Sequence, residues 1–101
     1  VVAGGALRII GVDKRAEFVD IRNDSGADVS LAGWTLRSEN GSQDCSLDGV
    51  LGAGQVLRIW AMAEDVGRGG YNCGFGKNIW NNSESDPAVL LDPSGAEVSR
   101  W

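Results

Sequence analysis

Two cysteines, Cys45 and Cys73, are the most reactive side chains in this sequence of 101 residues. They are too few for a four-thiolate metal site, and the chain has no histidine to complete a mixed zinc site. A disulfide between them would close a loop of about 28 residues, worth roughly 3–4 kcal/mol in the chain-entropy model. The even count and the small domain favour this disulfide, and two buried thiols in a reducing compartment are the alternative.

The missing histidine also limits catalysis, because imidazole is the usual general base near neutral pH. Ser-His-Asp and Cys-His sites cannot form within this chain. The 14 acidic residues offer carboxylate pairs of the kind that glycosidases use, but any acidic surface offers such pairs. Since no phosphate-binding loop and no Gly-x-Ser-x-Gly motif is present, we expect no enzyme activity, no bound cofactor and no metal site.

Aromatic side chains are the next candidates for function, because an exposed ring can stack on the C–H face of a sugar. The sequence contains four tryptophans, and core packing is the usual role of such rings. We expect Trp34 and Trp80 in the core. The candidates for contact with a ligand or partner are Trp60, Tyr71, Phe75 and Trp101.

The charge balance disfavours nucleic acid as a partner. Nine basic and 14 acidic residues give a net charge of −5, which repels a phosphate backbone. Arginines dominate the basic set, and on strands they most often pair with carboxylates of the neighbouring strand. A local polyanion site on one sheet face is the alternative. Six of the seven arginines carry this expectation, namely Arg8, Arg15, Arg22, Arg37, Arg58 and Arg100.

Glycine-rich turns divide the chain into short apolar segments. The turn motifs Asn23–Gly26, Asn40-Gly41, Leu51–Gly54 and Asp92–Gly95 lie between these segments, and two of them predict hairpins. The spacing of about 8–12 residues is typical of an all-β sandwich or barrel. The predicted strands are Leu7–Val12, Ala16–Arg22, Val29–Leu31, Trp34–Glu39, Asp44–Leu47, Gln55–Ala61, Val89–Asp92 and Ala96–Arg100.

Alternation along the strands predicts the core, because successive side chains of a strand point to opposite faces. Ala61–Val66 is the one candidate for a helical turn, and 64–87 reads as a long irregular segment that Cys73 would hold in place. The predicted structural core consists of Val19, Ile21, Trp34, Leu36, Leu57, Ile59 and Trp80, with Trp80 inserted from the irregular segment.

Five stretches follow one another along the chain: Glu17–Ser25, Gly33–Leu36, Ala53–Ala61, Asn78–Asn81 and Leu90–Val98. In their sequence and order they resemble the globular tail domain of nuclear lamins. The resemblance covers the chain from Leu7 to Val98 and implies an immunoglobulin-like β-sandwich of about nine strands. We therefore expect one domain over residues 1–101, with 1–5 as a linker or flexible N-terminus.

The sequence also departs from the lamins, since it carries neither a heptad-repeat rod nor a basic localisation signal. It is more similar to the stand-alone bacterial version of the domain, which implies an extracellular or cell-surface location; a nuclear location is the alternative. We expect a non-catalytic binding or anchoring module of a larger bacterial protein, without membrane insertion, whose partner is a protein or an envelope polysaccharide. A self-assembly or protein-interaction domain is the alternative, and a DNA-contact module is a weaker one. The sequence does not define the oligomeric state.

Overall fold

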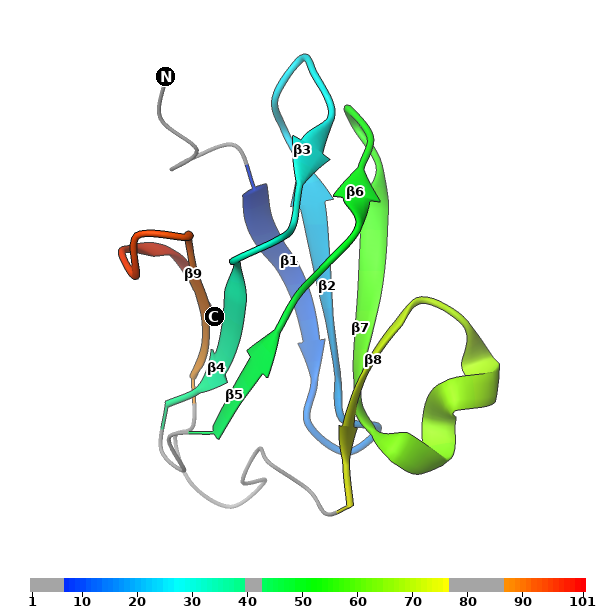
Figure 1. The fold of residues 1–101 in the computed structure, drawn as a ribbon. Coiled ribbons are helices and arrows are strands. Elements are labelled where there is room, and N and C mark those ends of the chain that lie inside the picture. The colour runs from blue at the N-terminus through cyan, green and yellow to red at the C-terminus, as the bar shows by residue number, and fades with distance from the viewer. Residues whose placement is uncertain (1–6, 40–42, 77–86) are drawn as a thin grey trace.

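The computed structural model describes residues 7–39, 43–76 and 87–101. Within these residues the chain forms ten strands and one 3-10 helix, η1 (Figure 1). The elements are β1 (Leu7–Asp13), β2 (Phe18–Asn23), β3 (Val29–Ser30), β4 (Thr35–Ser38), β5 (Gln43–Ser46), β6 (Val50–Leu51), β7 (Val56–Met62), η1 (Ala63–Arg68), β8 (Tyr71–Phe75), β9 (Ala88–Leu91) and β10 (Glu97–Arg100).

The strands form two four-stranded sheets that face each other, with a small two-stranded sheet beside them (Figure 1). The first sheet has the order β1-β2-β7-β8, the second the order β10-β9-β4-β5, and β3 pairs with β6. Neighbouring strands are antiparallel except for β7 and β8, which are parallel. The all-β sandwich predicted from the sequence is therefore confirmed.

All eight predicted strands are present within one or two residues of their expected bounds. The predicted helical turn corresponds to η1, which begins at Ala63. Two strands were missed: β6, which has only two residues, and β8, which lies inside the segment expected to be irregular. The remainder of that segment, 77–86, lies outside the described residues, and so does Trp80.

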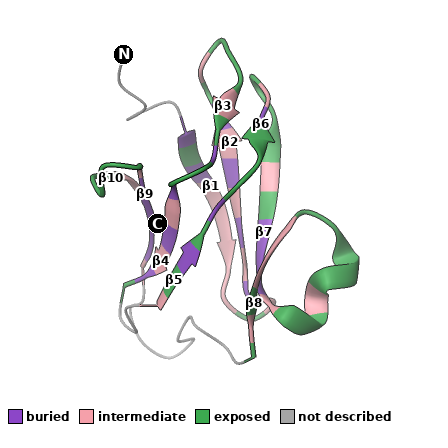
Figure 2. Ribbon diagram, viewed as in Figure 1, coloured by how far each residue is buried: buried purple, intermediate pink, exposed green. Residues whose placement is uncertain are grey.

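The core lies between the two sheets, and Figure 2 shows buried residues on strands of both sheets. In the first sheet Val19 pairs with Ile59 and Ile21 pairs with Leu57, so these residues share the inner face. The side chain of Leu57 is half-buried and packs against the core. The others of this group are fully buried, and the second sheet and its flanking loop contribute Trp34 and Leu36, which are exposed by no more than 1%.

The hairpin between β9 and β10 has the geometry that its Asp-Pro-Ser-Gly sequence predicts. The Asp92 N–H donates to the carbonyl of Ala96, and the Gly95 N–H donates back to the carbonyl of Asp92. Gly95 has a φ of 87°, which glycine adopts without steric cost. This turn reverses the chain into β10, where the Ser99 hydroxyl accepts from the Ile9 N–H of β1, so the C-terminal strand lies beside the N-terminal one.

Candidate functional site

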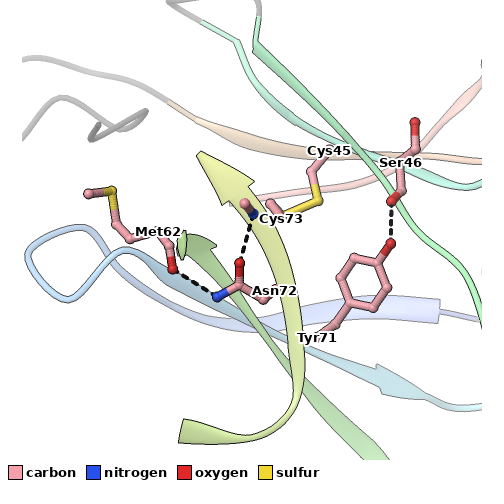
Figure 3. The surroundings of a disulfide bond; sticks show 7 residues. Cys45, Ser46, Met62, Tyr71, Asn72 and Cys73 are labelled. Carbon is pink, nitrogen blue, oxygen red and sulfur yellow. Dashed lines mark hydrogen bonds between the residues drawn. A yellow bond between two sulfur atoms is a disulfide. The ribbon is translucent and has the colours of Figure 1, made fainter. Parts of the chain in front are cut away.

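The predicted disulfide is present and joins Cys45 on β5 to Cys73 on β8 (Figure 3). These strands are the edges of different sheets, so the bond closes one side of the sandwich. Beside it the Tyr71 hydroxyl donates to the carbonyl of Ser46 at 2.7 Å, which links the same two strands again. The ring of Tyr71 is half-buried, and its hydroxyl is used within the domain.

β8 is also fixed to β7 by its own polar groups. The Asn72 side-chain amide donates to the carbonyl of Met62 at 2.8 Å, and its oxygen accepts from the Gly74 N–H (Figure 3). At the start of β8, Gly70 has a φ of 67°, and a Cβ there would lie 2.3 Å from the carbonyl oxygen of Arg58. Only glycine fits this approach, so the crossover from η1 to β8 depends on it.

Trp60 is not the exposed residue that we expected, because its side chain is only 6% exposed. The ring points away from the core, but its neighbours cover it. Phe18 packs against it edge to face with ring centroids 5.0 Å apart, and the Arg68 guanidinium lies 5.2 Å from its centroid. Arg58 covers Phe18 in turn, at 3.8 Å. An outward aromatic ring on a central strand is thus shielded by the long side chains around it.

Among the other aromatic candidates, Phe75 is half-buried against the core and Trp101 is 55% exposed. Trp101 follows β10, and both its N–H and its carbonyl bond to the backbone of Ala88. Its backbone position is therefore fixed by the second sheet while its indole faces solvent.

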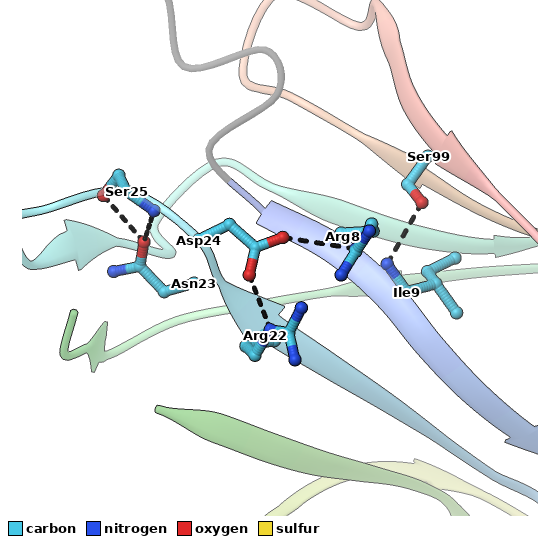
Figure 4. Close-up of polar contacts among 7 residues, drawn as sticks. All are labelled: Arg8, Ile9, Arg22, Asn23, Asp24, Ser25 and Ser99. Atoms are coloured by element: carbon cyan, nitrogen blue, oxygen red, sulfur yellow. Dashed lines mark hydrogen bonds and ion pairs between the residues drawn. The ribbon is translucent and has the colours of Figure 1, made fainter. Parts of the chain in front are cut away.

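Trp101 lines a shallow concavity of about 440 Å³ together with Arg8, Ile9, Ile10 and Arg22, which we call the Trp101 concavity. It lies where β1, the edge of the first sheet, approaches β10, the edge of the second. The Ile9 N–H donates to the Ser99 hydroxyl at 3.0 Å and ties these edges together (Figure 4). The concavity thus lies across the sandwich from the disulfide.

Arg8 and Arg22 are cross-strand partners, and one carboxylate holds both (Figure 4). The two oxygens of Asp24 lie 2.5 Å from the Arg22 Nε and 3.2 Å from the Arg8 Nε. The hydrogen bond from Arg22 lowers the pKa of Asp24, so this carboxylate stays ionised at neutral pH. The cluster therefore carries two positive charges and one negative charge.

Two arginines on the outer sheet faces, Arg37 and Arg58, form the expected ion pairs with the neighbouring strand. Arg37 binds both oxygens of Asp44 through Nε and Nη2, at 2.6 and 2.9 Å, and raises its own pKa by doing so. Arg58 binds Asp20 in the same two-point way. Arg100 bonds to two carboxylates, Glu39 and Glu97, through all three of its nitrogens. Arg8 and Arg22 differ from these arginines, since each contacts Asp24 through Nε and not also through a terminal nitrogen.

A second concavity, of about 300 Å³, lies beside η1 and includes the edge of Trp60. An ion pair between Arg68 and Asp65, at 2.9 Å, crosses it. Glu17, at the end of the β1–β2 turn, is 1% exposed and has a φ of 62°. Five of the eight residues that line this second concavity are charged, and their positive and negative charges nearly balance. The lining residues are Arg15, Ala16, Glu17, Trp60, Met62, Glu64, Asp65 and Arg68.

Asp24 is the site residue that the sequence did not reveal. It lies in a turn motif, where acids are common for conformational reasons, so its type carries no information about the arginines. The available indication was the placement of Arg8 and Arg22 near the ends of two consecutive strands. Their antiparallel pairing made them direct neighbours, and two adjacent arginines need a shared acid.

Two facing sheets with linked edges define an immunoglobulin-like β-sandwich, and its surface concavities contain no cluster of metal-ligating residues within the described part of the chain. The family model described as Lamin Tail Domain matches residues 2–101, so the chain belongs to the lamin tail domain family. Lamin-B2 of Homo sapiens is 29% identical over 104 residues, which cover 96% of this chain and 17% of Lamin-B2. The resemblance found in the sequence is confirmed.

The family and this relative are structural and non-catalytic. The chain spans less than a fifth of the length of Lamin-B2. No helix in the described residues has the length and apolar character needed to span a membrane.

Proposed function

We propose that this domain is a non-catalytic binding module of a larger extracellular or cell-surface protein of bacteria, and that it binds through the Trp101 concavity. The observation that carries the proposal is an indole 55% exposed beside two arginines, in a family without catalytic function. Exposed aromatic and arginine side chains are the groups that contribute most to recognition surfaces. The other aromatic candidates are covered or engaged within the domain.

The disulfide supports the extracellular part of the proposal. Disulfides form and persist in oxidising compartments, whereas the nucleus and cytosol keep thiols reduced. A nuclear domain of this fold would gain no stability from the Cys45–Cys73 bond. The acidic balance, with a net charge of −5, also suits a surface setting better than contact with DNA.

Co-sedimentation with insoluble polymers tests the binding function. The folded domain is mixed with peptidoglycan sacculi, cellulose, chitin and bead-immobilised DNA, and the bound fraction is measured in each pellet. We expect saturable binding to one polysaccharide and about a tenfold loss of affinity in Trp101→Ala, the effect of losing one stacked ring. Val66→Ala is the matched control, because Val66 is 70% exposed on η1 and lies outside the Trp101 concavity.

Two outcomes would contradict this function. The domain would pellet with no polymer at tens of micromolar, or Val66→Ala would weaken binding as much as Trp101→Ala. The first outcome, together with a solution mass that rises with concentration, would favour the alternative of a self-assembly domain.

A further inference from the structure

We infer that the Trp101 concavity recognises a carboxylated sugar unit of an acidic polysaccharide. Arg8 and Arg22 bind the carboxylate, and the Trp101 indole stacks on the sugar ring. This inference rests on the proposed binding function and adds the chemical class of the ligand.

The terminal amino groups of Arg8 and Arg22 are the first observation behind this ligand class. Both guanidinium groups meet Asp24 through Nε, and their terminal amino groups make no hydrogen bond to the described part of the chain. Arg37, by contrast, uses Nη2 as well as Nε on Asp44. A planar guanidinium with its terminal donors open matches the two oxygens of a carboxylate. Asp24 then acts as a positioning residue that orients both arginines.

The local charge favours single, spaced carboxylates over a phosphate backbone. Arg8, Arg22 and Asp24 together carry one excess positive charge, in a chain of net charge −5. Duplex DNA presents one negative charge per about 1.7 Å of its axis, and the rest of this acidic surface would repel it. A polysaccharide with one carboxylate per sugar places its charges farther apart. One such group neutralises the excess charge of this cluster.

The apolar part of the concavity fits the sugar ring. The Trp101 side chain is 55% exposed, and Ile10 beside it is half-buried, so a flat apolar surface lies next to the arginines. The volume of about 440 Å³ falls within the usual range of small-ligand sites, about 300–1,000 Å³. The bonds of Trp101 to Ala88 and of Ile9 to Ser99 hold the two walls in place before binding, which lowers the entropy cost.

Binding to polygalacturonate and to its carboxyl-reduced form tests this inference directly. The two polymers share a backbone and differ only in the carboxylate, and affinity is measured from the change in intrinsic tryptophan fluorescence or by affinity electrophoresis. We expect at least about tenfold weaker binding to the reduced polymer. Arg8→Gln is expected to lose about tenfold on polygalacturonate and little on the reduced polymer. Arg37→Gln is the matched control, since Arg37 lies on the outer face of the other sheet and is expected to bind as the wild type does.

The outcomes separate the ligand class from the function. Equal affinity for both polymers, or equal losses in Arg8→Gln and Arg37→Gln, would overturn carboxylate recognition and leave the binding function standing. Tighter binding to duplex DNA than to polygalacturonate would overturn it in favour of nucleic acid. A domain that binds none of the soluble or insoluble polymers would overturn both proposals. Thermal unfolding of each variant verifies that the fold is intact.

Discussion

The buried side chain of Asn23 holds together the turn that carries Asp24. Its amide donates to the carbonyls of Ala27 and Leu51 at 2.8 and 2.9 Å, and its oxygen accepts from the N–H and hydroxyl of Ser25. The side chain is 0% exposed, so every one of these bonds replaces a bond to water. One polar residue at the end of β2 thus fixes the turn, the small β3–β6 sheet and the carboxylate next to it.

Replacing Asn23 with aspartate tests this role with almost no change of shape. Asn23→Asp removes the amide donors and points a carboxylate oxygen at the carbonyls of Ala27 and Leu51. We expect the free energy of unfolding at pH 7 to fall by about 2–4 kcal/mol, measured by urea denaturation. Ser25→Ala is the control and should cost about 0.5–1.5 kcal/mol. Equal stability of the two variants would contradict the account.

Strand alternation made the burial of Asn23 predictable, although the sequence analysis placed it in a turn. Val19, Ile21 and Asn23 occupy successive inward positions of β2, so an alternating pattern continued for one more residue would have placed this amide inside. The covering of Trp60 was not predictable, because it depends on Arg68, which η1 brings back over the outer face. No periodicity along the chain encodes that contact.

Among the elements, β8 depends most on links to other strands. It lies at the edge of the first sheet, none of its residues is fully buried, and it pairs with β7 across a register shift. The disulfide, the Tyr71 hydroxyl and the Asn72 amide hold it from both sides. β8 therefore receives its stability from cross-links more than from apolar burial.

Removing the disulfide should weaken the whole domain. In the double variant Cys45→Ala, Cys73→Ala we expect a loss of about 3–4 kcal/mol in the free energy of unfolding, because the unfolded chain regains the entropy of a closed loop with a sequence separation of 28. Urea denaturation measures it. A reducing agent should lower the midpoint of the wild type and leave that of the double variant unchanged. A double variant as stable as the oxidised wild type would show that the bond contributes nothing.

The missed strands have a physical explanation. β6 has two residues, too few for alternation to be visible. β8 includes Asn72 and Gly74, which are rare in strands, and its parallel pairing follows a short 3-10 connection that no local turn motif announces. Turn motifs border most of the other strands, and β4 alternates clearly between buried and partly buried residues, so their positions followed from local chemistry.

At the scale of the whole molecule, ion pairs between carboxylates and arginines are spread over the outer faces of both sheets. Hydrogen bonds from arginine lower the pKa of Asp24, Glu39, Asp44 and Glu97. The Ser94 hydroxyl does the same for Asp92 in the β9–β10 turn. These groups lie at the surface, so each contribution is small, but all have the same sign.

This shared sign predicts how stability depends on pH. Native pKa values below the ordinary 3.8 of aspartate and 4.5 of glutamate mean that ionised carboxylates favour the folded state. Their contribution is complete above those values and is lost as the pH falls through the native pKa values. We expect a melting temperature that is level from about pH 6 to 8, since no histidine titrates there, and that falls below about pH 4.

Calorimetry across that range measures the dependence. Glu39→Gln, which removes the carboxylate from Arg100, should fall less steeply in acid than the wild type does. A melting temperature that rises on acidification would contradict the assignment of these shifts.

The Trp101 concavity forms only when both sheets of the domain are in place. Its residues come from the two ends of the described chain, and the bond that joins its walls connects residues 90 positions apart. The sequence indicates Trp101 as a contact candidate and Arg8 and Arg22 as possible parts of a polyanion site. The sequence does not show that these three residues lie together, because their proximity depends on how the edges of the two sheets pack against each other.

The most direct test of the central claim is a map of the ligand site on the labelled domain. Short polygalacturonate oligomers are titrated into ¹⁵N-labelled protein, and amide and indole shifts are followed by NMR. The account predicts that the largest shifts cluster at Arg8, Ile10, Arg22 and the indole N–H of Trp101, while residues of η1 stay unmoved. Shifts centred on η1 and Trp60, or no shifts at oligomer concentrations that saturate other acidic-sugar binders, would contradict it.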